Sequence, residues 1–497
     1  MNLKKCVLLL TSVVLCSYIM QAQTRSEKRG LAYDFPVSED IESIYQGVSW
    51  FYNWGYLPSQ DENIPETIDK CNMEFIPMTW NGGIQEEKLR EFYRNNPHVK
   101  YILGFNEPNF TEQANMTPTQ AAAKWPVLEK IAKEFGLKIV GPAVNYGPNG
   151  GSVSENGVVY TDPVKYLDDF FAACPDCQVD YIAVHCYMPN VSALQSYIDR
   201  FRKYDKPIWL TEFCAWDGGT TELSQRKFMA EAINYLETDP DVYRYSWFIG
   251  RWNSPHPYMQ IYGRYPGQLT NLGEVYVNMS SFDKNYFFSV NDTIQAQHYI
   301  EVSDGIHLEK TSDVSGKVNL MDFIMTRWVS YNIDIPESGE YEISYRVATN
   351  STTAELVFSA DGETLSTQKV VDTGGYANWT TITFDANLQK GKQRIRIDSN
   401  HTDARLNWLR ITPKKGSSIE SGYAESIKVF PNPTSGTVYV EGAEIEKMTL
   451  MDMAGKKLFD GKAVSSLDIS NYPAGIYLLS LESQEKEKIV KKIVKIN

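Results

Sequence analysis

Residues 100–106 (KYILGFN), 117–135 (TPTQAAAKWPVLEKIAKEF) and 138–145 (KIVGPAVN) decide the fold of the first half of the chain. The first and third stretches are short apolar runs bounded by polar residues, which predicts a strand in each. The middle stretch predicts a helix over 119–135, because it opens with a capping threonine, a proline at the first helical position and a glutamine that closes the capping box. Strand, helix and strand follow one another as in an α/β fold.

The same alternation extends from residue 30 to about residue 282. Strands are predicted at 30–34, 48–54, 74–80, 100–106, 138–145, 179–187, 207–213 and 243–248. Helices are predicted at 85–94, 119–135, 164–173, 193–204 and 224–236, among others. Eight apolar strands separated by helices within about 250 residues predict an α/β domain, a (β/α)₈ TIM barrel over residues 29–282. The functional residues of such a barrel lie at the C-terminal ends of its strands.

The second half of the chain has a different pattern. Helical periodicity disappears, and short strands with turn residues between them predict a β-sandwich (jelly roll) over residues 290–413. A polar stretch, 414–425, is expected to be a linker, and residues 426–497 predict a small all-β domain. Three unequal domains agree with a length of 497 residues.

Composition excludes some partners and favours another. With 48 basic and 62 acidic residues the net charge is −14, which argues against nucleic acid and anionic membranes as partners. Aromatic residues make up 13% of the chain, and all eleven tryptophans lie in the barrel and the sandwich. Flat aromatic rings stack on the apolar faces of sugars, so the composition suggests a carbohydrate ligand, although any single ring is as well explained as core packing.

The N-terminus is typical of a secretory signal peptide, predicted over residues 1–22. Two lysines precede the apolar run 6–20, which is followed by Gln21, Ala22 and Gln23. That run is too short and wrongly flanked for a membrane-spanning helix.

Five cysteines remain after that segment, too few and too scattered for a disulfide framework. Cys174 and Cys177 are either a local disulfide or half of a zinc site, and no second pair completes a zinc site. Cys186 and Cys214 are expected to be buried free thiols.

Two glutamates stand out against the apolar strands that precede them. Glu107, in the segment Asn106-Glu107-Pro108, ends the fourth strand, and Glu212 ends the seventh. Either one alone is equally well explained as half of a structural salt bridge with an arginine of the barrel. A pair at matching strand ends suits glycosidic bond cleavage, in which a protonated carboxyl donates to the leaving oxygen and an ionised carboxylate attacks the anomeric carbon. Burial would keep the acid protonated, and hydrogen-bond donors would keep the nucleophile charged.

The barrel resembles glycoside hydrolase family 128, the Asl1-like glycosyl hydrolase catalytic core of clan A. The matching stretches are 29–32, 48–54, 75–80, 104–108, 141–143, 177–187, 209–213 and 245–248. The resemblance implies a retaining enzyme that cleaves β-1,3-glucan internally, with Glu107 as the acid/base and Glu212 as the nucleophile. It requires no cofactor and no metal.

Other residues are expected to bind substrate. Asn106 is placed to hydrogen-bond the 2-hydroxyl of the sugar at the cleavage point. His185 and Tyr187 end the sixth strand and, being two residues apart, face the same side, so that Tyr187 is expected to hold Glu212 in its charged form. The candidate sugar platforms are Trp54, Trp80, Trp216, Trp247 and Trp252, with Trp80 and Trp247 favoured because they end strands.

The sandwich resembles carbohydrate-binding module family 6 over stretches at 294–299, 328–331, 339–347, 373–379 and 406–409. The resemblance implies a sugar held against Tyr376 with Asn407 at its base. Asp322 falls near the position where that family has a second aromatic wall. Gln295 and Gln297 replace acids that would supply oxygen charge to the family's structural calcium, so no metal is expected.

The last domain resembles the C-terminal sorting domain of the type IX secretion system. Its matching stretches are 429–433, 451–455, 472–477 and 490–492. The resemblance implies interaction with that secretion machinery and export across a Gram-negative outer membrane, to the medium or the cell surface.

Taken together, the sequence predicts a monomeric, secreted, retaining endo-β-1,3-glucanase. Two alternatives stay open: a clan A glycosidase for another β-linked polysaccharide, and a surface protein that binds glycan without turnover.

Overall fold

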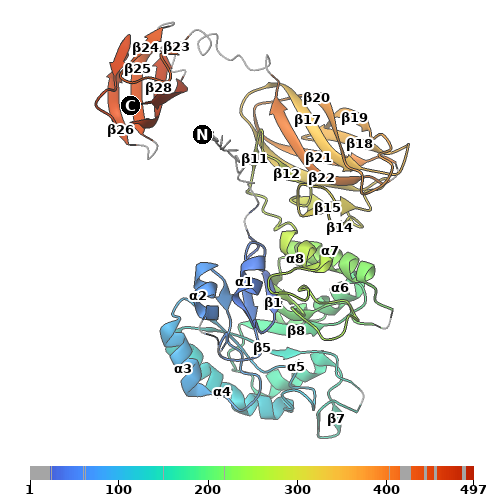
Figure 1. Cartoon of the computed structure of the whole chain (residues 1–497). Helices are drawn as coiled ribbons and strands as arrows, with labels where there is room; N and C mark the ends of the chain where they lie inside the picture. Colours follow the sequence, from blue (N-terminus) through green and yellow to red (C-terminus); the bar gives the residue numbers. More distant parts are fainter. Residues whose placement is uncertain are drawn as a thin grey trace, which may run out of the picture. The chain divides into compact units, whose positions relative to one another are not determined.

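The computed structural model describes residues 23, 25–59, 61, 63–148, 150–217, 219–401, 403–414, 427–441, 445–452, 456–483 and 488–496. The predicted signal peptide 1–22 and nearly all of the predicted linker lie outside the described residues. Figure 1 follows the chain from blue to red through a barrel of helices and strands, a strand-rich domain and a small terminal β-domain. Among the described residues, no helix is both long and apolar enough to span a bilayer.

The first domain is the predicted TIM barrel. Its eight parallel strands pair in the order β3-β2-β1-β10-β9-β8-β5-β4. The ring closes where Leu103 N donates to Pro77 O and Thr79 N to Leu103 O, 2.9 and 3.0 Å. The strands are β1 (Arg29–Ala32), β2 (Trp50–Tyr52), β3 (Glu74–Phe75), β4 (Tyr101–Leu103), β5 (Lys138–Val144), β8 (Tyr181–Cys186), β9 (Ile208–Phe213) and β10 (Val242–Trp247). All eight lie within or next to the predicted ranges, and most are shorter.

Helices cover the outside of the ring (Figure 1). They are α1 (Ser38–Ile44), α2 (Asn63–Lys70), α3 (Glu86–Asn95), α4 (Pro118–Phe135), α5 (Pro163–Ala173), α6 (Val191–Asp199), α7 (Glu222–Thr238) and α8 (Asn271–Asn278), with a 3₁₀ turn at Arg202–Tyr204. The capping box predicted before α4 is present, because Thr117 and Gln120 each bond the other's backbone. A two-stranded hairpin, β6 (Ser154–Glu155) and β7 (Val158–Val159), extends the loop after β5.

One glycine fixes the end of β4. A Cβ atom on Gly104 would lie 2.8 Å from the ring of Trp125, a residue of α4 that is fully buried. Helix α4 therefore packs directly on the backbone that leads to residues 106 and 107.

The structure also decides between the alternatives for the cysteines. Cys174 and Cys177 form a disulfide, and Cys186 and Cys214 are buried free thiols.

The second domain is a sandwich of two sheets. One sheet has the order β11-β16-β21-β18-β19 with β13 beside β16, and the other has the order β14-β15-β22-β17-β20 with β12 beside β22. The strands are β11 (Phe288–Ser289), β12 (Ile294–Gln295), β13 (Glu301–Val302), β14 (His307–Lys310), β15 (Val318–Met321), β16 (Trp328–Ile335), β17 (Gly339–Ala348), β18 (Glu355–Ala360), β19 (Glu363–Lys369), β20 (Thr380–Leu388), β21 (Gly391–Ser399) and β22 (Arg405–Pro413).

The terminal domain is all-β, as predicted. One sheet has the order β23-β24-β27 and the other β26-β25-β28-β29. Their strands are β23 (Lys428–Phe430), β24 (Thr437–Glu441), β25 (Ile445–Asp452), β26 (Lys457–Lys462), β27 (Ser466–Asp468), β28 (Gly475–Ser483) and β29 (Lys488–Lys495). Buried aliphatic residues such as Val438, Leu450, Leu479 and Ile493 form its core.

Candidate active site

The barrel brings Glu107 and Glu212 together, although they are far apart in sequence. The nearest oxygens of the two carboxylates lie within 4.8 Å of each other. Both side chains are buried, with 7% and 5% of the residue exposed. Two buried carboxylates at this separation repel each other, so the pair needs added protons or hydrogen-bond donors.

His185, on β8, lies between the two glutamates. Its Nδ1 is 2.9 Å from Glu107 Oε1 and 3.4 Å from Glu212 Oε2. We assign a proton to Nδ1 because both neighbouring atoms are acceptors. Burial lowers the pKa of His185, but attraction to Glu212 and the hydrogen bond to Glu107 outweigh it and leave that pKa raised. His185 is fully buried beneath the pair, so it supports the carboxylates rather than lining the cavity.

Three donors surround Glu212. Tyr52 Oη and Trp54 Nε1 donate to Oε1 at 3.1 and 2.8 Å, and Tyr187 Oη donates to Oε2. Burial raises the pKa of the Glu212 carboxyl and the nearby Glu107 raises it further, whereas His185, Tyr187 and Trp54 oppose the rise. The donors on both oxygens favour the carboxylate form of Glu212, but burial outweighs them and the pKa of its carboxyl stays raised.

Glu107 has a different environment. Asn145 Nδ2 donates to its Oε1 at 3.0 Å, the same oxygen that His185 contacts. No described residue donates to Oε2. The backbone of Glu107 has a φ of 41°, in the left-handed region that a non-glycine residue rarely adopts. Its N–H donates to Ala143 O at 2.8 Å, which ties the strained residue to β5.

A cavity of about 460 Å³ opens above the two glutamates. It is lined by Trp54, Trp80, Asn106, Glu107, Phe110, Gln113, Asn145, Tyr187, Glu212, Trp216 and Phe248. Asn106 is 3% exposed, and its Oδ1 accepts no hydrogen bond from the residues described, while its Nδ2 donates to Gln113 at 3.2 Å. The wall of the cleft therefore contains a buried, unpaired amide oxygen beside the glutamates, with aromatic rings around them.

The tryptophans predicted as platforms separate into three groups. Trp54, Trp80 and Trp216 line the cavity. Trp252 does not line it and packs against Trp216, with ring centroids 6.0 Å apart. Trp247 is fully buried against Phe213, and its Nε1 donates to Met259 O at 2.7 Å, so it lies in the core. Ending a strand was thus insufficient to identify a cleft residue, because alternate residues of a strand point to opposite sides.

Several residues of the cleft were missed by the sequence analysis. Tyr52 precedes Trp54 by two residues on one predicted strand, so alternation alone would have placed both on one face. Asn145 is the last residue of another predicted strand. Phe110 and Gln113 lie in the loop after β4, for which no sequence pattern indicates a direction.

The two sandwich residues are not brought together. Tyr376 lines a cavity of about 780 Å³ with Ile324, Met325, Asn350, Ser351, Thr352, His401 and Asp403. The guanidinium carbon of Arg405 lies 4.3 Å from the centroid of the Tyr376 ring. Asn407 is fully buried outside this cavity and donates to Asp313 Oδ2 and Ser315 O at 2.8 and 2.9 Å.

Among the described residues, one group could hold a metal ion: Glu107, His185 and Glu212. Each of its members already takes part in the hydrogen bonds described above. His185 Nε2 is buried and has no hydrogen-bond partner among the described residues.

Replacing Tyr187 by Phe removes a donor to the ionised form of Glu212. We expect the pKa of the Glu212 carboxyl to rise further, because a hydrogen bond that favours the carboxylate is lost. Infrared difference titration of the carboxyl band would measure the shift. The control Tyr93→Phe removes a buried hydroxyl that donates to Tyr101 O, remote from the pair, and should leave the band unchanged. An unchanged Glu212 titration in Tyr187→Phe would contradict this account of the donors.

Comparison with known proteins agrees with these domains. Family models match residues 30–276 (glycosyl hydrolase catalytic core), 295–413 (carbohydrate binding module, family 6) and 428–496 (secretion system C-terminal sorting domain). The chain is 31% identical over 237 residues to alkali-sensitive linkage protein 1 of Schizosaccharomyces pombe, covering 45% of this chain and 39% of that protein. It thus spans less than half the length of this curated relative.

Two solved structures match separate domains. A subgroup II family 128 endo-β-1,3-glucanase from Pseudomonas viridiflava is 38% identical, over 51% of this chain and 98% of that one, with a TM-score of 0.47. A carbohydrate-binding module from Cellvibrio mixtus lichenase 5A, solved with cellotriose, is 34% identical over 25% of this chain and 99% of that one, with a TM-score of 0.25. Since the identity to the first extends over nearly all of that protein, the chain belongs to glycoside hydrolase family 128, with a family 6 carbohydrate-binding domain and a secretion sorting domain joined to the catalytic core.

Proposed function

We propose that this chain is a secreted endo-β-1,3-glucanase that hydrolyses laminarin-type or curdlan-type glucan with retention of configuration. The observation that carries the proposal is the unequal environment of two adjacent buried glutamates at the floor of an aromatic cleft. Relatives named endo-β-1,3-glucanases from Pseudomonas viridiflava and Sorangium cellulosum, 38% and 37% identical, support the choice of substrate.

In the first step Glu107 donates a proton from Oε2 to the glycosidic oxygen while a Glu212 oxygen attacks the anomeric carbon. The glycosidic bond breaks, the leaving chain departs with the proton, and a covalent glycosyl-enzyme forms on Glu212. In the second step Glu107 takes a proton from water, and the resulting hydroxide displaces Glu212 from the anomeric carbon. Two inversions at one carbon give net retention.

The separation of the carboxylates favours this double displacement. Inverting enzymes need about 6.5–9.5 Å between the carboxyl groups to admit a water molecule, whereas retaining enzymes need about 5–5.5 Å. The nearest oxygens of Glu107 and Glu212 lie within 4.8 Å. This close approach of the oxygens agrees better with the shorter separation of retaining enzymes.

The walls of the cleft suit a glucan chain. The rings of Trp54, Trp80 and Trp216 offer faces for stacking on sugars. The unpaired Oδ1 of Asn106 is placed to accept a hydrogen bond from a sugar hydroxyl near the cleavage point, an interaction that strengthens in the transition state.

Rescue by azide distinguishes the acid/base role proposed for Glu107 from the nucleophile role proposed for Glu212. Glu107→Ala is expected to lower kcat on laminarin by about 10²–10⁴-fold. Added azide should restore turnover by attacking the glycosyl-enzyme and give a β-glycosyl azide. Glu212→Ala is expected to lose turnover to background, and azide should give the α-glycosyl azide, because only one inversion then occurs. NMR of the products distinguishes the two anomers. Glu66→Gln, which replaces an exposed carboxyl on α2, serves as the control.

A kcat equal to that of the wild-type chain in either alanine variant, without azide, would overturn the role assignment. If the wild-type chain releases oligosaccharides from another β-linked polysaccharide and none from laminarin or curdlan, the substrate claim fails. If it binds glucan but releases no product from any polysaccharide, the non-catalytic alternative holds.

We assign sugar binding in the sandwich to the cavity beside Tyr376, without Asn407. Tyr376→Ala in an inactive Glu212→Gln chain is expected to weaken binding to insoluble curdlan about tenfold, equivalent to about 1.4 kcal/mol, because a stacking face is removed. Depletion isotherms measure the affinity. Tyr265→Ala removes an exposed tyrosine of the barrel and should change nothing. Equal affinity of the two variants would assign the sandwich a spacer role.

The sorting domain supports export by the type IX route. A chain that lacks residues 426–497 is expected to stay within the envelope of a type IX-competent host, whereas the full chain appears outside the cell or on its surface. Fractionation and glucanase assays of medium and envelope measure the distribution. Unimpaired export of the shortened chain would refute this route.

A further inference from the structure

Asp322 stands near the position where the family 6 modules have an aromatic wall, and here it makes ion pairs. Its Oδ2 lies 2.7 Å from Lys227 Nζ and 2.6 Å from His307 Nδ1. Lys227 belongs to α7 of the barrel, whereas Asp322 and His307 belong to the sandwich. The residue that departs from the family pattern is therefore part of an ionic contact that joins the two domains.

His307 contacts carboxylates on both sides. Its Nε2 lies 2.8 Å from Glu231 Oε1, also on α7, and the residue is 6% exposed. A neutral imidazole donates from one ring nitrogen only and presents a lone pair on the other. A lone pair facing a carboxylate oxygen at hydrogen-bond distance is repulsive, so only the doubly protonated imidazolium satisfies both contacts.

The charges around His307 balance only when it is protonated. Lys227 and the His307 imidazolium offset Glu231 and Asp322 within this cluster of four. Loss of the proton leaves one uncompensated negative charge in a partly buried contact, which costs free energy.

The neighbouring charges are already engaged elsewhere. On α7, Arg226 Nε donates to Leu308 O at 3.1 Å, and its Nη1 lies 3.9 Å from Glu222. On α8, Glu274 pairs with Lys310 of β14 at 3.1 Å. Within the sandwich, Glu309 pairs with Arg405 at 2.8 Å, and Asp403 pairs with the same arginine.

We infer that His307 is a proton-operated clamp. As an imidazolium it ties α7 of the barrel to the sandwich through Glu231 and Asp322, and the contact opens when its proton leaves. The sandwich is then docked firmly below the titration of His307. Above it the sandwich is held to the barrel more weakly, by contacts such as those of Arg226 with Leu308 and of Glu274 with Lys310.

The electrostatics support this geometry. Burial lowers the pKa of His307, but hydrogen bonds to Asp322 and Glu231 outweigh it and leave that pKa raised, while His307 holds the pKa of Asp322 well below its usual range. Because undocking removes Glu231 from His307, the docked state has the higher histidine pKa. Docking is therefore fully favoured below the ordinary histidine pKa. This stabilisation is lost as the pH rises through the pKa that His307 has in the docked state.

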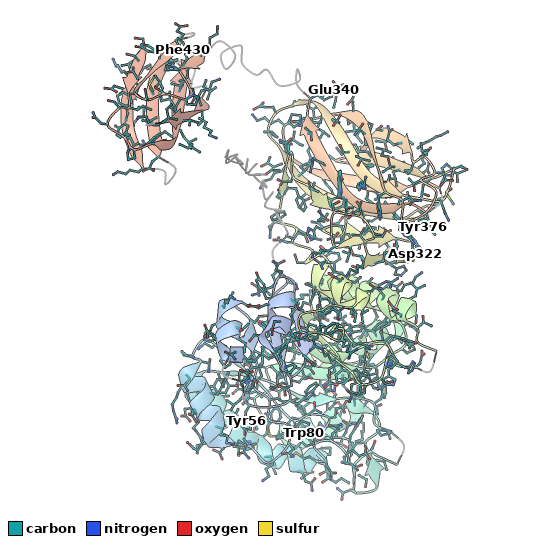
Figure 2. The ribbon with its side chains drawn as sticks, viewed as in Figure 1. Tyr56, Trp80, Asp322, Glu340, Tyr376 and Phe430 are labelled. Carbon is teal, nitrogen blue, oxygen red and sulfur yellow. A yellow bond between two sulfur atoms is a disulfide. The ribbon has the colours of Figure 1, made fainter. Side chains whose placement is uncertain are left out.

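Docking also fixes the position of the sandwich cavity. Asp322 lies two residues before Ile324, which lines the cavity with Tyr376, and Figure 2 labels Asp322 and Tyr376 on the same edge of the sandwich. The clamp thus holds the wall beside Tyr376 next to α7. Release of the clamp would let the sandwich move relative to the barrel.

Differential scanning calorimetry of the full chain tests the clamp on either side of the histidine titration, at about pH 5.5 and about pH 9. We expect the barrel and sandwich of the wild-type chain to unfold in one transition at the lower pH and in two at the higher. His307→Gln, which cannot carry the charge, should show two transitions at both values. Glu231→Gln should do the same while leaving the sandwich interior intact, so the test survives if His307→Gln fails to fold.

His98→Gln is the matched control, since it removes an exposed histidine of the barrel that contacts neither carboxylate. It should behave as the wild-type chain does. A single wild-type transition at both pH values would overturn the clamp, as would a wild-type pH dependence that persists in both Glu231→Gln and His307→Gln. Neither result depends on which polysaccharide the barrel cleaves.

Discussion

The barrel is organised around one costly arrangement: two buried carboxylates whose nearest oxygens lie within 4.8 Å, with His185 between them. Nothing local in the sequence stabilises this. Glu107 follows β4, Glu212 lies on β9 and His185 on β8, so the run of neighbouring strands β9, β8, β5 and β4 brings them together. The left-handed backbone at Glu107 is a further cost that the barrel offsets by the hydrogen bond to Ala143.

The carboxylates of the cleft and those at the junction of barrel and sandwich are stabilised by different partners. In the cleft, the neutral groups of Tyr52, Trp54 and Tyr187 donate to Glu212, and His185 lies between the two carboxylates. At the junction of barrel and sandwich, carboxylates are matched by formal positive charges on Lys227 and His307. A hydrogen bond from a neutral donor stabilises a carboxylate without cancelling its negative charge, as the mechanism proposed for Glu212 requires. Ion pairing cancels that charge, which suits a contact between domains.

The sequence allowed the order of strands, the two glutamates and the role of Tyr187 as a donor to be predicted, because apolar runs, strand ends and residue alternation are local properties. It misplaced Trp247, since ending a strand does not say which side the residue faces, and its indole packs on Phe213 in the core. It paired Asn407 with Tyr376, whereas Asn407 is buried beside Asp313. Phe110 and Gln113 could not have been found, because the path of a loop depends on tertiary contacts.

Trp54 forms part of the cleft wall and also donates to Glu212. One side chain therefore affects both the shape of the cleft and the basicity of Glu212, and its backbone, at a φ of 60°, leaves it few alternative positions. Descendants of this enzyme that adapt to a new glycan cannot change this wall without also changing reactivity. Trp80 and Phe110 line the same cleft with no bond to either carboxylate among the contacts described. Divergence in specificity should accumulate at those two positions first, while Trp54 stays fixed.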